Sequence, residues 1–304
     1  MHSFLRSVGF SELKSREELK KLQNEILTAP TRRTIIKTGD GIRHLQLERD
    51  FAYGIGVAVR GDLDERGVFQ LDHYYPYYRS DIVTSTEEVA VNKRMDTDAY
   101  TAMCEDMRLG VSLIFYLLNS VDYKRYADRL QDSSFIAPIS LSALSAGGKI
   151  LLGVDQSLRE ENLRSGAEEK KRDKLIAEAR KGNQEAIDSL TIEDMDLYAD
   201  INRRARKEDI YSIVDTSFVP FGSESDNYSI IGTIQEFEKI INNETQEEMY
   251  VLSLSCNELE FPVCINAKDL LGVPENGRRF KGNIWLQGSV EFSGDFPADA
   301  EKQD

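Results

Sequence analysis

The chain has 304 residues, of which 53 are acidic and 38 basic, so its formal net charge is -15. This charge repels phosphate backbones and anionic lipid, so we expect neither nucleic acid nor a bare membrane as partner. The length predicts two domains, each with its own core. A composition of 40% apolar and 30% charged residues indicates a folded globular chain.

Neither the cysteines nor the apolar segments indicate a metal, secretion or membrane insertion. Cys104, Cys256 and Cys264 are odd in number and lack CxxC spacing, which is typical of buried free thiols in a reducing compartment. Met1–Phe10 lacks the basic and apolar regions of a secretory leader. The longest apolar run, Val111–Leu118, is far shorter than the roughly 20 residues that span a bilayer. We therefore expect a soluble cytoplasmic protein without cofactor or metal.

The N-terminal half predicts one helix and a set of strands. Ser15 and Glu18 form a capping-box pattern before apolar residues at helical spacing, which predicts a helix over residues 16–28. Runs rich in β-forming residues then predict antiparallel strands and hairpins, over Thr34–Lys37, His44–Glu48, Gly54–Arg60, Val68–Tyr78 and Glu87–Asn92.

Two further segments of this half have patterns that need interpretation. The apolar run within Tyr100–Asn119 fits a buried strand or a buried helix, and we favour a helix that leads into a strand. Gly147–Gly148 supplies the positive φ of a tight turn, which predicts a hairpin between Phe135–Leu144 and Lys149–Val154.

The middle of the chain changes character. Leu158–Tyr211 is dense in charge and poor in β-branched runs, which predicts two or three helices. The triplet Lys170–Arg172 is the only hint of a basic patch. Basic and acidic residues are nearly balanced over Leu158–Lys181, which favours a solvated helix face over a binding patch.

The C-terminal third alternates apolar and polar residues between turns. Strands are predicted at Tyr228–Phe237, Met249–Cys256 and Glu260–Ile265, followed by a helical turn and two last strands, at Ala267–Leu271, Phe280–Gln287 and Ser289–Phe292. Three strands, a helix and two strands is the element order of the OB-fold, a small five-stranded barrel.

Together these elements predict an α+β protein, in which a helical connector joins an N-terminal antiparallel sheet with helices to a small OB-like β-barrel. The predicted boundaries are 1–156 for the α+β domain, 157–222 for the connector, 223–293 for the barrel and 294–304 for a flexible acidic tail.

Several stretches resemble a known family. They are Met1–Phe10, Ile187–Asp196, Ser212–Thr216, Asp269–Gly272 and Gly277–Gly288. These stretches are similar to an uncharacterised family of cytoplasmic proteins from anaerobic Firmicutes, a domain of unknown function. The resemblance covers the whole chain. The resemblance implies a compartment and a class, but no active-site residue.

Two segments are candidate ligand sites. His73–Arg79 holds four tyrosines around a proline, so Tyr74, Tyr77 and Arg79 could bind a ligand; an aromatic edge strand explains the same composition and is favoured.

Near the C-terminus, Arg278 and Arg279 lie close to Trp285, a mixture that can bind single-stranded nucleic acid. The acidic surroundings favour a structural role for these residues instead.

Standard catalytic devices are absent from the sequence. There is no GxGxxG, phosphate loop, GxSxG or paired-histidine metal motif. Asp62–Gly67 begins like a calcium loop, but Arg66 and His73 occupy positions that need oxygen ligands, so a hairpin turn is favoured.

We therefore expect a non-enzymatic protein that binds a protein partner or regulates one. The alternative is an enzyme that acts on a small polar substrate in a cleft between domains, with Tyr74, Tyr77, Arg79 and Asp81 around it. The sequence leaves the oligomeric state open.

Overall fold

The structure, a computed structural model, describes residues 2–38, 41–95, 97–106, 111–130, 134–151, 183 and 216–292. Met1–Leu151 and Thr216–Asp304 form one compact unit, to which all described residues except Asn183 belong. Its elements in chain order are η1 (Ser3–Val8), α1 (Arg16–Thr28), β1 (Arg32–Lys37), β2 (Arg43–Ala52), β3 (Ile55–Leu63), β4 (Phe69–Tyr78), β5 (Ser85–Lys93), β6 (Tyr100–Asp106), β7 (Val111–Leu117), α2 (Ser120–Tyr123), α3 (Ala127–Leu130), β8 (Phe135–Leu151), β9 (Ser217–Pro220), β10 (Asn227–Ile241), β11 (Glu248–Cys256), β12 (Leu259–Asn266), η2 (Ala267–Asp269), β13 (Leu270–Leu271) and β14 (Arg279–Val290).

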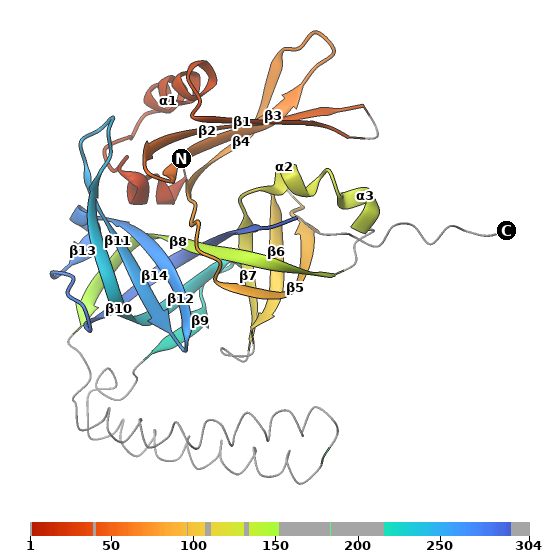
Figure 1. The fold of residues 1–304 in the computed structure, drawn as a ribbon. Helices are drawn as coiled ribbons and strands as arrows, with labels where there is room; N and C mark the ends of the chain where they lie inside the picture. The colour runs from red at the N-terminus through yellow and green to blue at the C-terminus, as the bar shows by residue number, and fades with distance from the viewer. Residues whose placement is uncertain are drawn as a thin grey trace. The chain divides into compact units, whose positions relative to one another are not determined.

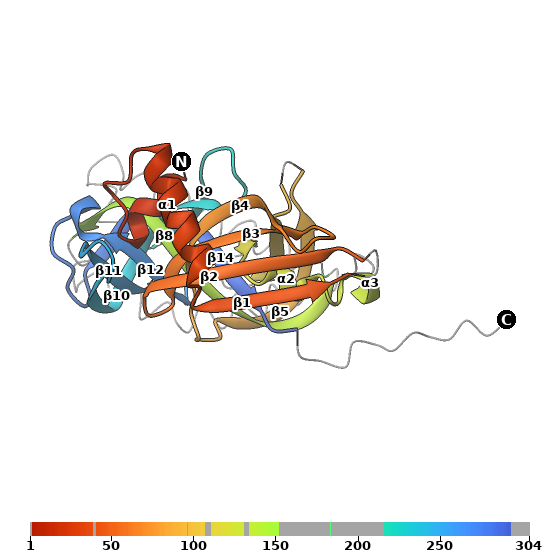
Figure 2. The ribbon, with the colours of Figure 1, turned by 90° about the horizontal axis from the view of Figure 1, so that it is seen from above.

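The first four strands form a separate antiparallel sheet in the order β1-β2-β3-β4, here called the small sheet. Helix α1 covers one face and α2 lies against the other (Figures 1 and 2). The predicted helix over residues 16–28 is confirmed, and so is its capping box between Ser15 and Glu18. The predicted strands and hairpins of this region are confirmed as well.

The other ten strands form one large sheet that closes on itself twice. Strands β8, β12, β11, β10 and β14 pair in a ring, and β8, β5, β6, β7 and β14 pair in a second ring. Both rings share the long antiparallel pair β8–β14, which crosses the middle of Figure 1. Strand β8 can serve two rings because β5 pairs with its first part, from Phe135 to Ile139, and β12 with Ala143–Ser145.

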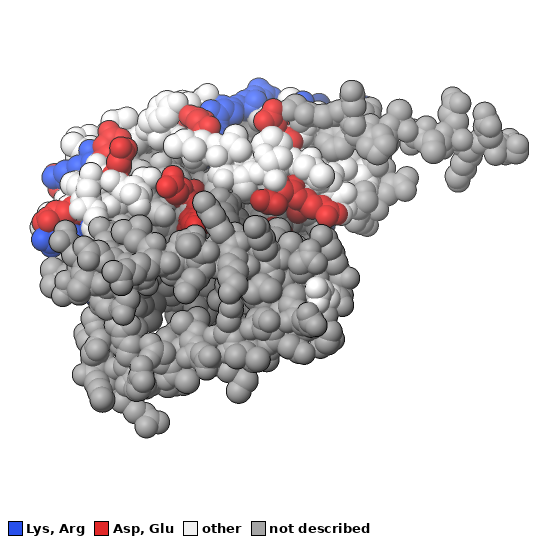
Figure 3. Space-filling model, turned by 60° about the horizontal axis from the view of Figure 1, so that its bottom comes forward, with Lys and Arg blue, Asp and Glu red and all other residues white. Residues whose placement is uncertain are grey.

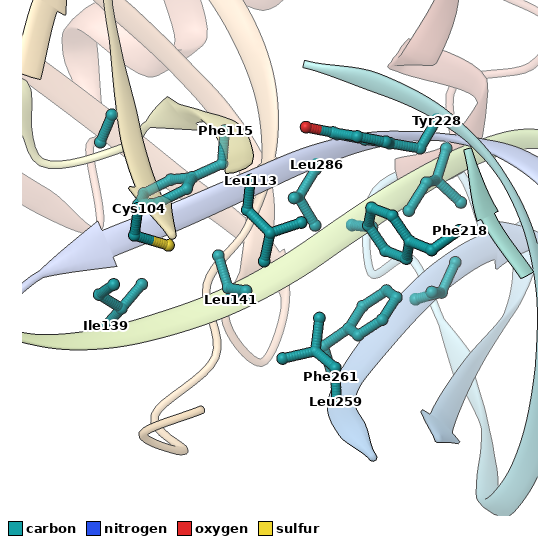
Figure 4. Close-up of a cluster of buried hydrophobic side chains, with 14 of the residues drawn as sticks. Cys104, Leu113, Phe115, Ile139, Leu141, Phe218, Tyr228, Leu259, Phe261 and Leu286 are labelled. Carbon is teal, nitrogen blue, oxygen red and sulfur yellow. The ribbon is translucent and has the colours of Figure 1, made fainter. Parts of the chain in front are cut away.

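A single apolar cluster fills the two rings. Figure 4 shows Leu141 and Leu286 on the shared strands, with Phe115 and Cys104 to one side and Phe261 to the other. All five of these side chains are at most 2% exposed. Burial of this kind stabilises a fold by roughly 1.5–3 kcal/mol for each large side chain, so the shared pair is the centre of the hydrophobic core.

The predicted α+β architecture is wrong. The described chain is mostly strand, with three α-helices, of which α2 and α3 have four residues each. The predicted OB-like barrel of residues 223–293 does not stand alone either, because β8 and β7, from the N-terminal half, pair with β12 and β14. Element order alone could not show that a fifth strand comes from residues 135–151.

Two local predictions are also corrected. The described residues of the segment 100–119 form the antiparallel pair β6–β7 where a helix followed by a strand was predicted. The predicted hairpin at Gly147–Gly148 is absent from the described chain, because β8 continues through both glycines to Leu151. Gly148 lies opposite Gly282 in the β8–β14 pair, and the ring of Phe280 packs against it. Glycine is therefore needed here for a close approach and not for a turn.

Much of the predicted helical connector and the acidic tail lies outside the described residues, as does the basic triplet Lys170–Arg172. Within the predicted connector range, residues 217–220 form β9, which pairs with β10. The helices among the described residues are all too short or too polar to cross a membrane.

Candidate functional site

The two faces of the small sheet differ in chemistry. Leu45, Leu47, Val57 and Val59 alternate on one face and share an apolar cluster with residues of α1. The alternate positions carry polar side chains, although α2 and the end of β7 cover them: His44, Gln46, Glu48, Arg60, Asp62 and His73. We call this second face the polar layer.

Hydrogen bonds attach the polar layer to the large sheet. Gln46 Nε2 and the Tyr75 hydroxyl both donate to the carbonyl oxygen of Leu118, at 3.1 and 3.2 Å. Arg60, which is 2% exposed, donates to the Ser120 hydroxyl at 2.7 Å. A buried polar group is costly unless it is bonded, so these bonds fix how the small sheet sits on the rest of the unit.

Charged side chains of the polar layer are paired at one end around Asp98. Lys124 donates to Asp98, and Arg60 lies 3.5 Å from the same carboxylate. Burial alone would raise the pKa of Asp98, but the hydrogen bonds from Lys124 and Lys93 outweigh it and lower that pKa. Burial lowers the pKa of Lys124 despite its partner. The cluster therefore holds its charges by mutual compensation.

A second charged group lies at the other end, around Glu48. Arg32 and Arg79 each donate to Glu48 Oε2 at 2.8 Å, and Gln46 donates to Oε1. Burial raises the pKa of Glu48, which the surrounding donors only partly oppose. These side chains, with that of Tyr77, line a cavity of about 360 Å³.

Between the small sheet and the large sheet lies a larger cavity of about 480 Å³, here called the junction cavity. Trp285 forms one wall and donates its indole hydrogen to Asp226 at 3.0 Å. Arg94 pairs with Asp226 at 3.1 Å and also with Glu224. Other lining residues come from η1, β4 and β7, namely Phe4, Tyr74, Tyr75 and Tyr116. Aromatic walls with a few fixed polar groups are typical of small-molecule sites.

Two histidines border the junction cavity. His2 lies with its ring centroid 4.7 Å from that of Trp285, and burial followed by nearby positive charge lowers its pKa from 6.5 to about 4. His73 bonds Asp72 through Nδ1 at 2.6 Å and the Tyr116 hydroxyl through Nε2 at 3.1 Å. The result is a carboxylate, imidazole and phenol in series. Burial lowers the pKa of His73 and raises that of Tyr116 well above its usual value.

The structure divides the residues that the sequence singled out among three places. Tyr74 and Trp285 line the junction cavity, while Tyr77 and Arg79 line the cavity around Glu48. Arg278 pairs with Glu275 at 2.9 Å, and Arg279 is buried at the start of β14.

Sequence reasoning missed several polar residues of the junction cavity and the polar layer, among them Arg60, Arg94, Tyr116 and Asp226. They lie far apart in the chain, so no spacing rule groups them. A weak signal for Arg60 and Glu48 was present in the sequence, because they are charged residues within strands whose other residues have the apolar pattern of buried strands.

The fold and site define a mostly-β protein in which a paired ionic layer and a mixed aromatic and polar cavity separate two sheets. Residues 5–288 match the family described as "Domain of unknown function, E. rectale Gene description (DUF3881)", and the chain belongs to this family. The predicted resemblance to a domain of unknown function is thereby confirmed. No curated protein matches the chain, and no solved structure does.

Proposed function

We propose that this protein is a non-enzymatic binding protein that holds a small polar ligand in the junction cavity and so regulates a partner. The observation that carries the proposal is the make-up of the cavity. Its walls come from six separate parts of the chain, and its polar groups are held in place by bonds such as that from Trp285 to Asp226. A pre-formed site of this kind loses little entropy on binding.

The physical state of the polar groups favours binding over catalysis. A general acid or base works best when its pKa lies near the working pH. Burial lowers the pKa of His73 from its usual value and raises the pKa of Tyr116 far above its usual value. Both side chains are therefore neutral at pH 7, where they serve well as hydrogen-bond donors and acceptors for a ligand.

A cytoplasmic location belongs to the same proposal. Cys104, Cys256 and Cys264 are all free and buried, as the sequence predicted. Burial raises the pKa of Cys256 to about 12, and it also raises the pKa of Cys264 above its usual value. Inert thiols of this kind are typical of proteins from a reducing compartment.

The test uses one variant that fills the cavity and a matched neighbour. Thr97 is exposed at the rim of the junction cavity, and Met95 is a fully exposed residue of the same β5–β6 connection that does not line it. Protein purified from a bacterial host is extracted and analysed by mass spectrometry, and thermal shifts are recorded with sets of sugars, amino acids and nucleosides. We expect wild type and Met95→Trp to bind one of these classes and Thr97→Trp to lose it. Equal binding by Thr97→Trp would contradict the proposal.

The series Asp72–His73–Tyr116 favours one second candidate, an enzyme that acts on a small polar substrate in the same cavity. In that case the ligand identified above is converted on incubation, and Tyr116→Phe abolishes turnover while binding persists. A ligand recovered unchanged after long incubation leaves binding as the function.

A further inference from the structure

A groove of about 400 Å³ lies on the surface away from the junction cavity. It runs between the β4–β5 connection and the strands β10, β11 and β12. We call it the acidic groove and define it by six lining residues: Tyr53, Asp81, Ile82, Glu236, Glu238 and Glu260. The acidic groove shares no lining residue with the junction cavity and shares Arg79 and Asp81 with the cavity around Glu48.

Exposed apolar side chains gather in the acidic groove. Tyr53 is 88% exposed and Ile82 71%. Single exposed apolar residues are ordinary, but Tyr53 and Ile82 border one depression together with the half-buried Val251 and Pro262, and such a patch is poorly solvated by water. The Tyr53 hydroxyl donates to Asp81 at 2.9 Å, so this ring is held across the groove.

The charges of the acidic groove are negative and uncompensated. Glu236, Glu238 and Glu260 are exposed and form no ion pair within the described part of the chain. Arg79 is the basic residue among those that line the groove, and it is engaged by Glu48 at 2.8 Å and by Asp50 at 3.7 Å. On the face drawn in Figure 3, acidic side chains are spread over the described surface and basic ones lie mainly at its margins. Such a field attracts a basic partner from a distance.

We infer that the acidic groove docks an extended segment of a partner protein that carries lysine or arginine residues between apolar ones. Basic side chains of the segment would meet Glu236, Glu238 and Glu260, and its apolar side chains would cover Ile82 and Tyr53. A small polyamine matches the charge alone and leaves the apolar rim exposed, so the combination indicates a peptide. The inference does not depend on a ligand in the junction cavity.

The experiment measures binding of a fluorescent twelve-residue peptide of alternating lysine and leucine to the full chain. The groove variant is Glu236→Gln/Glu238→Gln/Glu260→Gln. The control is Glu17→Gln/Glu65→Gln/Glu105→Gln, which removes three exposed acids elsewhere and changes the net charge equally. A second pair compares Ile82→Ser with Ile136→Ser, because Ile136 is 77% exposed outside the groove.

We expect the groove triple variant to weaken binding about tenfold or more, which corresponds to about 1.4 kcal/mol, and the control triple to change it by less than about threefold. Ile82→Ser should weaken binding and Ile136→Ser should not. Equal effects of the two triple variants would overturn the inference. Spermine that binds as tightly as the peptide, and equally to wild type and Ile82→Ser, would also overturn it, because the groove would then bind a polyamine. A dimer in sedimentation that Ile82→Ser dissociates would overturn it too, because the groove would then bind a second copy of the chain.

Discussion

Gln287 of β14 binds the free edge of β4 at Tyr78, whose backbone N–H donates to Gln287 Oε1 at 3.0 Å. The same side chain donates from Nε2 to the carbonyl oxygen of Pro76 at 2.9 Å. Gln287 is fully buried. Its amide therefore hydrogen-bonds the edge of β4 as the backbone of a neighbouring strand would. This side chain joins the small sheet to the shared pair β8–β14.

Replacement of the amide donor of Gln287 should destabilise the protein. Gln287→Glu keeps the shape but places a carboxylate against the Pro76 carbonyl, and we expect a loss of about 3 kcal/mol of unfolding free energy because a buried charge is left unpaired. Gln70→Glu, an exposed position of the same strand β4, is the control and should change stability by less than about 0.5 kcal/mol. Urea denaturation measures both, and similar midpoints would contradict the role assigned to Gln287.

Asp226 should be important for stability because two donors depend on it. Asp226→Ala removes the acceptor of the Trp285 indole and a partner of Arg94, and we expect a loss of about 3 kcal/mol in urea denaturation. Asp226→Asn keeps an oxygen for the indole and should lose less. Glu224→Ala is the matched control, since Glu224 pairs with the same arginine at the surface and should contribute under about 1 kcal/mol. Equal losses at positions 224 and 226 would argue against a buried anchor.

Two adjacent glycines of β8 should respond differently to alanine. A Cβ on Gly148 would lie 2.3 Å from the ring of Phe280, whereas a Cβ on Gly147 would meet nothing within 4 Å. We expect Gly148→Ala to lose about 1–3 kcal/mol through overpacking and Gly147→Ala to be neutral or slightly stabilising. Phe280→Leu should relieve part of the cost in the double variant. Thermal unfolding that ranks the two alanine variants equally would refute the close packing described for Gly148.

The stability of the protein should fall in acid partly through His2. An unfolded histidine takes up its proton near pH 6.5, whereas folded His2 does so near pH 4. The neutral side chain therefore contributes stability that is fully present above pH 6.5 and is lost as the pH falls toward 4. His2→Asn keeps the acceptor for the Phe4 N–H and removes the titration.

Unfolding free energies of wild type and His2→Asn, measured from pH 7.5 to 4, should therefore differ in slope, by up to about 3 kcal/mol over the range. Parallel curves for the two proteins would show that His2 is not buried as a neutral group.

Local signals in the sequence predicted local structure well. Ser15 and Glu18 lie on one helical turn, so their pattern located the start of α1. The alternation of apolar and polar residues located the strands of the small sheet, because it too is a pattern among near neighbours in the chain. The prediction at Gly148 was wrong because this glycine is needed for the close approach of Gly282, which lies opposite it but far away in the chain.

The same limit applies to the candidate site. Trp285, Asp226 and Arg94 meet across 59 and 132 positions of sequence, and no pattern of spacing connects them. Tyr74 and Tyr77 line different cavities, whereas Tyr74 and its neighbour Tyr75 line the same one. The alternation of side chains along the strand therefore does not decide which of them share a cavity.

The shared pair β8–β14 has a consequence for synthesis of the protein. β14 (Arg279–Val290) is the last strand among the residues that the structure describes, and it closes both rings. Neither ring can therefore be completed while the nascent chain is still short of residue 290. Until then β7, β8 and β10 present open edges that can pair with other chains. A truncation before Arg279 should therefore yield aggregates and no half-sized folded fragment.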